Sequence, residues 1–128
     1  MAQITSHNIS APKSGETAWL WLVKIVTGPL LIILILIHFI VNHFMAEGGL
    51  LTYTDVIAYY QNPLIPAMEI LFLATVVTHS LIGLRGIILD LKPSRSILKV
   101  IDWILVIAGV SAVLYGTWLA LTIASTGV

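Results

Sequence analysis

Three long apolar segments constrain the fold of this chain more than any other feature. Hydrophobic residues fill 59% of the 128 positions and charged residues only 9%, which leaves too little polar surface to cover a soluble globule. The segments cover residues 20–45, 66–89 and 100–123. Each is long enough to cross ~30 Å of hydrocarbon as a tilted helix. The sequence therefore predicts an all-α integral membrane protein, with a tail at residues 1–19 and three transmembrane helices within residues 20–124.

The basic residues predict which way the helices cross the membrane. Six Lys and Arg balance six Asp and Glu, so no net charge attracts nucleic acid or another polyanion. The connection at 46–65 contains no basic residue. By the positive-inside rule the tail and the 91–99 connection face the cytoplasm, and residues 46–65 and the C-terminus lie outside. The basic residues are Lys13, Lys24, Arg85, Lys92, Arg95 and Lys99.

The tail and the outer connection are predicted from local patterns. The tail lacks the Arg-rich bias of a transit peptide and the layout of a cleaved signal, so it is interpreted as cytosolic. In the outer connection, the apolar spacing over residues 51–60 favours a short interfacial helix before the Asn62-Pro63 turn. Pro66 suits the first turn of the second span. The chain has no cysteine, which excludes disulfides and thiolate metal sites within it.

The second span carries a stripe of chemistry-bearing residues. His79, Gly83, Gly86 and Asp90 fall on one helical face. A neutral imidazole at membrane depth, one turn from a bare backbone, is what a membrane b-type haem requires. The alternative is a small-residue packing face with His79 hydrogen-bonded to a neighbouring helix. Arg85 within the same span needs an anion, either a haem propionate or a lipid phosphate.

The first span adds two more histidines, at positions 38 and 43. A five-residue spacing turns them about 140° apart, so they cannot both face one cofactor. His38 follows the apolar run 30–37, and Asn42 lies one turn on, whereas His43 is expected at the wet outer surface. Counted from Lys24 and from Asp90 as inner ends, the depths of His38 and His79 are about 21 Å and about 16 Å.

The remaining residues of note have simpler interpretations. His7 in the tail is expected to be solvated. The third span has no histidine, and its small residues and terminal tryptophans predict a packing surface and interfacial anchors. These are Gly109, Ser111, Ala112 and Gly116, with Trp103 and Trp118.

Two motifs together resemble a known family. The string His79-x-x-x-Gly83-x-Arg85 with Asp90 eleven residues after the histidine, and the segment 24–28 at the start of the first span, are similar to the membrane-anchor cytochrome b subunits of succinate dehydrogenase and fumarate reductase. The resemblance covers residues 19–121. It implies that His79 is an axial ligand of the inner haem b. In anchors with two haems, a histidine ten residues beyond the Thr-Gly glycine serves the outer haem, a role that would pass to His38.

The resemblance also implies partners, since each helix offers a haem only one axial ligand. A second, homologous anchor subunit would supply the others, an iron–sulfur subunit and a flavoprotein subunit would dock at the cytoplasmic rim, and this chain would be a non-catalytic subunit in a prokaryotic inner membrane. Lys24, Thr27 and Asp90 match the region around the quinone pocket. Several ubiquinone-reducing members have a tyrosine after that Asp, whereas this chain has Leu91, which favours menaquinone.

Two other functions fit the same residues. In a haem-free anchor of this family, the polar residues at these positions would fill a cavity without iron. A small transporter or proton-conducting subunit would also bury ionisable groups, but along a continuous pathway. The third span offers no such pathway, because its one charged residue, Asp102, lies at the inner end.

The topology can be tested by labelling a cysteine introduced with Ser94→Cys. Because the basic residues place the 91–99 connection in the cytoplasm, an impermeant thiol reagent should label it only after cell lysis. The chain has no other cysteine, so the wild type is the blank. Efficient labelling in intact cells would reverse the predicted orientation.

Overall fold

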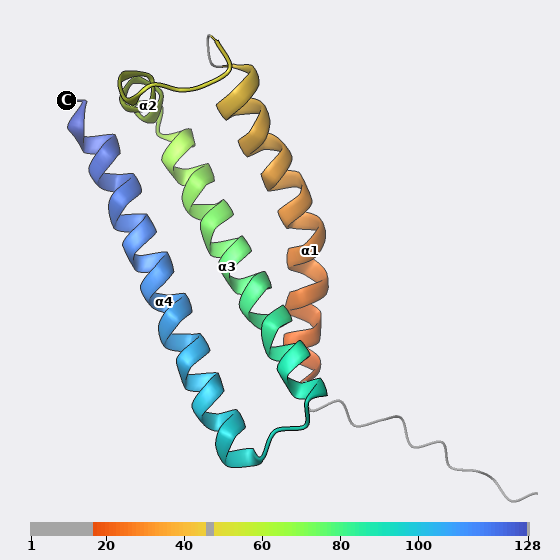
Figure 1. The fold of residues 1–128 in the computed structure, drawn as a ribbon. Coiled ribbons are helices and arrows are strands. Elements are labelled where there is room, and N and C mark those ends of the chain that lie inside the picture. The colour runs from red at the N-terminus through yellow and green to blue at the C-terminus, as the bar shows by residue number, and fades with distance from the viewer. Residues whose placement is uncertain (1–16, 46–47, 128) are drawn as a thin grey trace, which may run out of the picture.

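The computed structural model describes residues 17–45 and 48–127, and it is all-helical there. Helix α1 (Ala18–Phe39) continues as a π-helical stretch, η1 (Ile40–Phe44). Helix α2 (Tyr53–Tyr60) is short, whereas α3 (Leu64–Asp90) and α4 (Arg95–Thr126) are long (Figure 1). The predictions for most of the tail, including His7 and Lys13, lie outside the described residues.

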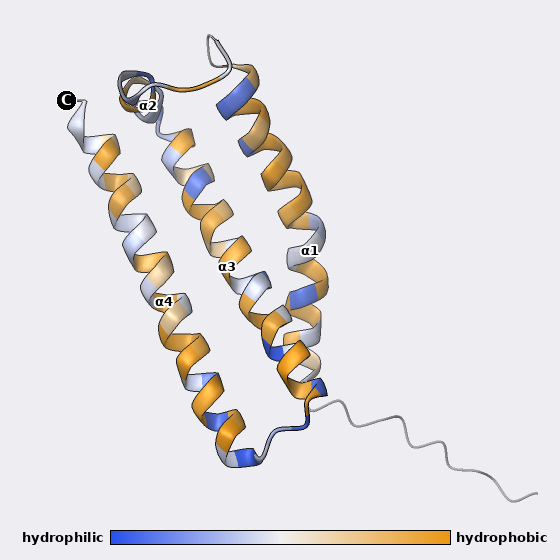
Figure 2. Ribbon diagram, viewed as in Figure 1, coloured by the Kyte–Doolittle hydropathy of each residue, from blue (hydrophilic) through white to orange (hydrophobic). Residues whose placement is uncertain are grey.

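The predicted fold class is confirmed. Three helical segments in the described residues are long and apolar enough to cross a membrane: Ala18–Phe44, Leu64–Asp90 and Arg95–Thr126. Hydrophobic residues dominate all three along their length (Figure 2). All three begin before the apolar runs at 20, 66 and 100, because hydropathy marks the hydrocarbon-spanning part of a helix and not its ends.

Local capping sets the start of α4. Ser94 has an extended backbone, and its hydroxyl accepts a hydrogen bond from the Ile97 amide. This N-cap starts the helix five residues before the apolar run, so the connection is 91–94 and not 91–99. Within it, Lys92 has a left-handed backbone with φ of 51°. Arg95 and Lys99 therefore lie in the first turns of α4.

The predicted short helix in the 46–65 connection is also found. A capping box between Thr52 and Asp55 starts α2, and the hydrogen bond from the Thr52 hydroxyl lowers the pKa of Asp55. Helix α2 lies across the ends of α3 and α4 (Figure 1) and contacts both. Gln61, at its C-cap, donates to the Ala124 carbonyl of α4. We refer to this side of the molecule as the α2 end and to the opposite side as the 91–94 end.

The three long helices form a single layer with α3 in the middle. Helix α3 packs against α1 on one side and α4 on the other, and among the described residues α1 and α4 do not contact each other. Within residues 17–45 and 48–127 almost nothing is buried: the buried apolar side chains there are Leu34, Pro66 and Ala120. Large apolar side chains such as Trp103, 68% exposed, cover both faces. Such a layer needs lipid or partner helices against it.

Two glycines bring α4 close to α3. A Cβ added at Gly109 would lie 2.6 Å from Leu81 Cδ1, and one added at Gly116 would meet the side chain of Leu73. The predicted packing role of these glycines is confirmed for this pair of helices. Ser111 and Ala112, predicted to share that surface, are exposed and take no part in it.

Enlarging Gly109 should weaken the α3–α4 contact. We expect Gly109→Leu to destabilise the protein by about 1–3 kcal/mol, the usual cost of forcing extra methylenes into a packed contact. Unfolding in mixed micelles with increasing sodium dodecyl sulfate, followed by tryptophan fluorescence, measures this. Ala112→Leu is the matched control on an exposed position of the same helix. Equal loss in both variants would show that the effect is not close packing against Leu81.

Candidate functional site

His79 lies in the seam between α3 and α1, and one contact indicates which of its ring nitrogens donates a hydrogen bond. Its Nδ1 is 2.9 Å from the Thr27 hydroxyl, which lies 2.7 Å from the Val23 carbonyl oxygen. Two oxygens this close require a hydrogen between them, and only the hydroxyl has one to give. His79 therefore donates its Nδ1–H to Thr27. Its Nε2 carries the free lone pair, and no described residue hydrogen-bonds to that atom.

The surroundings of His79 are narrow on one side and open on the other. A Cβ added at Gly28 would lie 3.6 Å from His79 Cε1, so this glycine lets the ring lie against the backbone of α1. One turn further along α3, a Cβ added at Gly83 would meet nothing within 4 Å. A Cβ added at Gly86 would lie 4.0 Å from Lys24 Nζ. The predicted stripe thus has open backbone beside the histidine and an ammonium group near its end.

Arg85 faces away from that stripe. Six residues after His79, it is rotated about 120° around the helix. It makes a two-pronged ion pair with Asp102 of α4, with Nε–Oδ1 at 2.7 Å and the second contact at 3.2 Å. The sequence placed Asp102 at the start of the third span but did not pair it with Arg85. A haem propionate or lipid phosphate is therefore not needed to explain the guanidinium, since its anion comes from the same chain.

A second polar cluster lies nearer the α2 end and centres on Glu69, a residue that the sequence analysis missed. His38 Nδ1 lies 2.8 Å from Glu69 Oε2. Asn42 donates to the His38 carbonyl at 2.7 Å and to Glu69 at 3.3 Å, and Tyr59 of α2 donates to Glu69 at 3.1 Å. The carboxylate thus ties α1, α2 and α3 together. Its signal in the sequence is plain: it is the only acidic residue in the apolar run 66–89.

Glu69 determines the hydrogen-bonding of its neighbours. A carboxylate can only accept, so His38 presents its Nδ1–H to Glu69 and no described residue hydrogen-bonds to its Nε2. Burial first, and then the negative charge of Glu69, raise the pKa of Tyr59 well above its ordinary value. Tyr59 therefore stays protonated and remains a donor at neutral pH. His43, in contrast, is exposed, with its Nδ1 3.2 Å from the Gly49 carbonyl oxygen and its ring against Phe39, as expected for an interfacial histidine.

The two histidines occupy separate levels of one seam. Thr27 and His38 are eleven residues apart on α1, and Glu69 and His79 ten apart on α3, so the two contacts lie about 15 Å apart along the helices. The separation of about 5 Å expected from the sequence is too small. The estimate treats Lys24 and Asp90 as lying at the same depth in the membrane. The Thr27–His79 and His38–Glu69 contacts instead place Lys24 level with about residue 83 of α3, roughly 10 Å further from the 91–94 end than Asp90. One iron cannot bind both rings.

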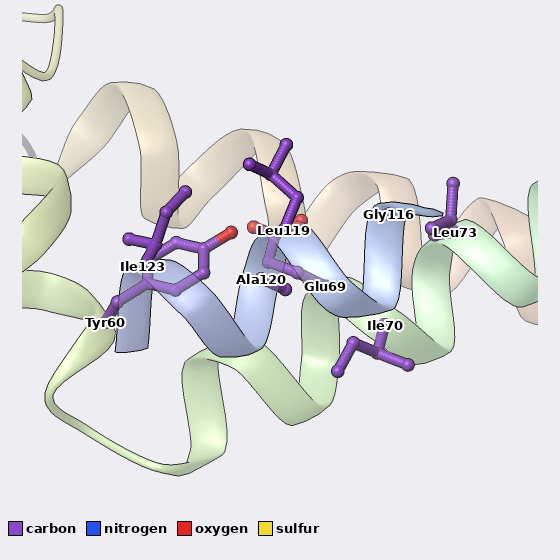
Figure 3. A pocket seen from close by; sticks show the side chains of 8 residues that line it. All are labelled: Tyr60, Glu69, Ile70, Leu73, Gly116, Leu119, Ala120 and Ile123. Atoms are coloured by element: carbon purple, nitrogen blue, oxygen red, sulfur yellow. The ribbon is translucent and has the colours of Figure 1, made fainter. Parts of the chain in front are cut away.

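Two hollows flank α3 on its α4 side. A cavity of about 170 Å³ near the α2 end is lined by apolar side chains, with Tyr60 and Glu69 as its polar members (Figure 3). A groove of about 670 Å³ runs toward the 91–94 end, where Arg85 and Asp102 line it. Neither hollow includes His79 or His38. The two histidines therefore lie in the α1–α3 seam, outside both hollows.

The two histidines are arranged as single nitrogen donors. Among the described residues no group of three or more His, Cys, Asp or Glu could hold a metal ion. Each histidine instead stands alone, with one nitrogen held by a hydrogen-bond acceptor and the other available. A ligating histidine usually donates its second ring N–H to a nearby acceptor in this way. The other predicted site residue, Asp90, is exposed at the end of α3.

Comparison with known proteins places this geometry in context. The sequence profile described as "Succinate dehydrogenase/Fumarate reductase transmembrane subunit" matches residues 3–125. A succinate dehydrogenase hydrophobic membrane anchor subunit from Archaeoglobus fulgidus is 32% identical over 103 residues, which cover 80% of this chain and 87% of that protein. No solved structure matches the chain.

Removing Glu69 should loosen the α2 end. Glu69→Ala leaves His38, Asn42 and Tyr59 without their shared acceptor, and unsatisfied buried donors cost about 1–3 kcal/mol. We expect a clear loss of stability in the mixed-micelle unfolding measurement. Glu69→Gln, which keeps one acceptor oxygen, should lose less.

Thr122→Ala is the control for this prediction, because its hydroxyl bonds only within α4, to the Trp118 carbonyl. A Glu69→Ala protein as stable as the control would show that the cluster does not hold the helices together.

Proposed function

We propose that this chain, which belongs to the succinate dehydrogenase/fumarate reductase transmembrane subunit family, is the haem b-binding anchor of a succinate:quinone oxidoreductase. The chain is a multi-pass membrane protein, and its family membership ties it to that complex. The observation that carries the haem assignment is the state of His79. Its Nδ1–H is donated to Thr27, its Nε2 is available, and Gly83 leaves open backbone beside it.

The residues present fit a haem b. Iron in such a haem takes imidazole nitrogens as axial ligands, and a His79 that donates its Nδ1–H to Thr27 would keep Nε2 for that role. The space beside Gly83 is where a side chain would otherwise block a flat ring. Lys24 Nζ, near Gly86, offers a cation to the propionates in place of Arg85, which is paired with Asp102. When bound, haem supplies a one-electron relay within the membrane.

A second haem is proposed at His38, nearer the α2 end. The two rings are about 15 Å apart along the helices, so each serves a separate haem and leaves one axial position of each to a partner. The open single-layer fold leaves room for that partner, which we propose is a second, homologous anchor subunit. The iron–sulfur and flavoprotein subunits are proposed to dock at the 91–94 end, on the cytoplasmic side of a prokaryotic inner membrane.

The quinone is proposed to bind near the same end. Lys24 of α1 and Asp90 of α3 are polar residues toward that end, and Asp90 is exposed where α3 ends. Leu91, which follows Asp90 and is 78% exposed, offers no hydroxyl to a quinone carbonyl. This supports menaquinone as the substrate.

A haem-free anchor remains the second candidate, and one observation favours it. Thr27 and Glu69 give both histidines a hydrogen-bond partner within the chain, as packing histidines would have. A transporter is less well supported. The cavity that Glu69 lines and the groove that Arg85 and Asp102 line share no residue, so these polar groups do not join into a path through the described residues.

Haem content separates these candidates. In the purified complex, His79→Leu should remove one low-spin haem and His38→Ala the other, because each variant deletes an axial ligand. Leucine suits a transmembrane helix, so loss of haem in His79→Leu should not reflect failed insertion. The pyridine haemochrome assay and the reduced-minus-oxidised spectrum measure both.

His43→Leu, at an exposed histidine five residues from His38, should keep full haem content. A His79→Leu complex with unchanged haem would show that His79 is a packing residue. A wild-type complex without haem bands would support the haem-free anchor.

A further inference from the structure

We propose that Thr27 is a positioning residue that orients the His79 imidazole toward haem and sets its electronic character. This inference rests on the proposed function, in which His79 is an axial ligand. It assigns to Thr27 a role different from the quinone contact that its motif implied. The role of Thr27 follows from the acceptor to which its single hydroxyl proton is donated.

The Thr27 hydroxyl has no proton to offer a quinone. Its hydrogen is committed to the Val23 carbonyl at 2.7 Å, with the Lys24 carbonyl as a weaker second acceptor at 3.3 Å. A quinone carbonyl is itself an acceptor and needs a donor. Toward His79, in contrast, Thr27 needs only a lone pair, which it has. The hydroxyl is therefore arranged to receive the imidazole N–H and not to bind quinone.

The local sequence holds this lone pair in place. Threonine is β-branched, so few side-chain rotamers are open to it in a helix, and its bond to the carbonyl four residues earlier fixes the one observed. Gly28 follows at once and lets the His79 ring approach α1. Together they fix the ring plane, because one edge is hydrogen-bonded and Cε1 faces the backbone. The imidazole can then meet iron in one orientation.

The partner of Nδ1 also tunes the ligand. Donation of its N–H to an acceptor makes an imidazole more basic, which favours ferric over ferrous iron. Removing the acceptor should therefore raise the midpoint potential of the haem that His79 binds. It should also release the ring plane, which alters the g values of a low-spin haem.

The test uses three variants of the purified complex. Thr27→Val keeps the shape of the side chain and removes the acceptor, and Thr27→Ser keeps the hydroxyl. Thr75→Val is the matched control: Thr75 is buried in α3 and its hydroxyl bonds only the Leu71 carbonyl. Potentiometric titration and electron paramagnetic resonance of the ferric haems are the readouts. We expect Thr27→Val to shift the potential upward and change the g values, Thr27→Ser to restore both, and Thr75→Val to leave both unaltered.

The outcomes distinguish the alternatives. Unaltered potentials and g values in Thr27→Val, with a higher KM for quinone, overturn the proposal and return Thr27 to the quinone site. If Thr27→Val does not assemble, Thr27→Ala removes the same acceptor without bulk and is judged by the same two readouts. Failure of the proposed function is a separate result, because a haem that survives His79→Leu with its signals unchanged is not bound by His79.

Discussion

The seam between α1 and α3 is the interaction on which the rest of this structure depends. Thr27 with His79, and His38 with Glu69, join two antiparallel helices at two levels. In hydrocarbon no water competes for these groups, so each must find its partner within protein. The two contacts therefore fix the register of α1 against α3. They also leave each imidazole with one committed and one available nitrogen, which links the packing of the helices to the proposed ligation.

The single layer of helices explains why such a chain needs lipid or partner helices against its two faces. With α3 between α1 and α4, both faces of the layer remain open and almost no side chain is fully buried. A haem needs two axial ligands and an enclosing pocket, and under the proposed function a layer of this kind would offer each haem one ligand and one wall. The α2 end is better closed, since α2 packs across α3 and α4 and Tyr59 reaches Glu69.

The sequence predicted the helices well because hydropathy and length are local properties. It also singled out His79, His38 and Gly83, since an imidazole or a glycine stripe at membrane depth is conspicuous, and their role in binding haem stays a prediction. It missed Glu69 and the pairing of Arg85 with Asp102 because both depend on which helix lies beside which. The depth estimate failed for the same reason: Lys24 and Asp90 were assumed to be level, and only the register of α1 against α3 shows that they are not.

Helix α3 also resolves the problem of carrying charge inside a membrane. Its ionisable residues before Asp90 are Glu69, His79 and Arg85, and each is turned toward a neighbouring helix and partly buried. The histidine and the carboxylate face α1, whereas the guanidinium faces α4. The exposed positions of α3 between its first turn and Asp90 are apolar or hydroxyl-bearing, such as Leu71, Thr78 and Ile87. A cofactor can therefore approach the α1–α3 seam without meeting the Arg85–Asp102 pair, which leaves that pair to hold α4 in place.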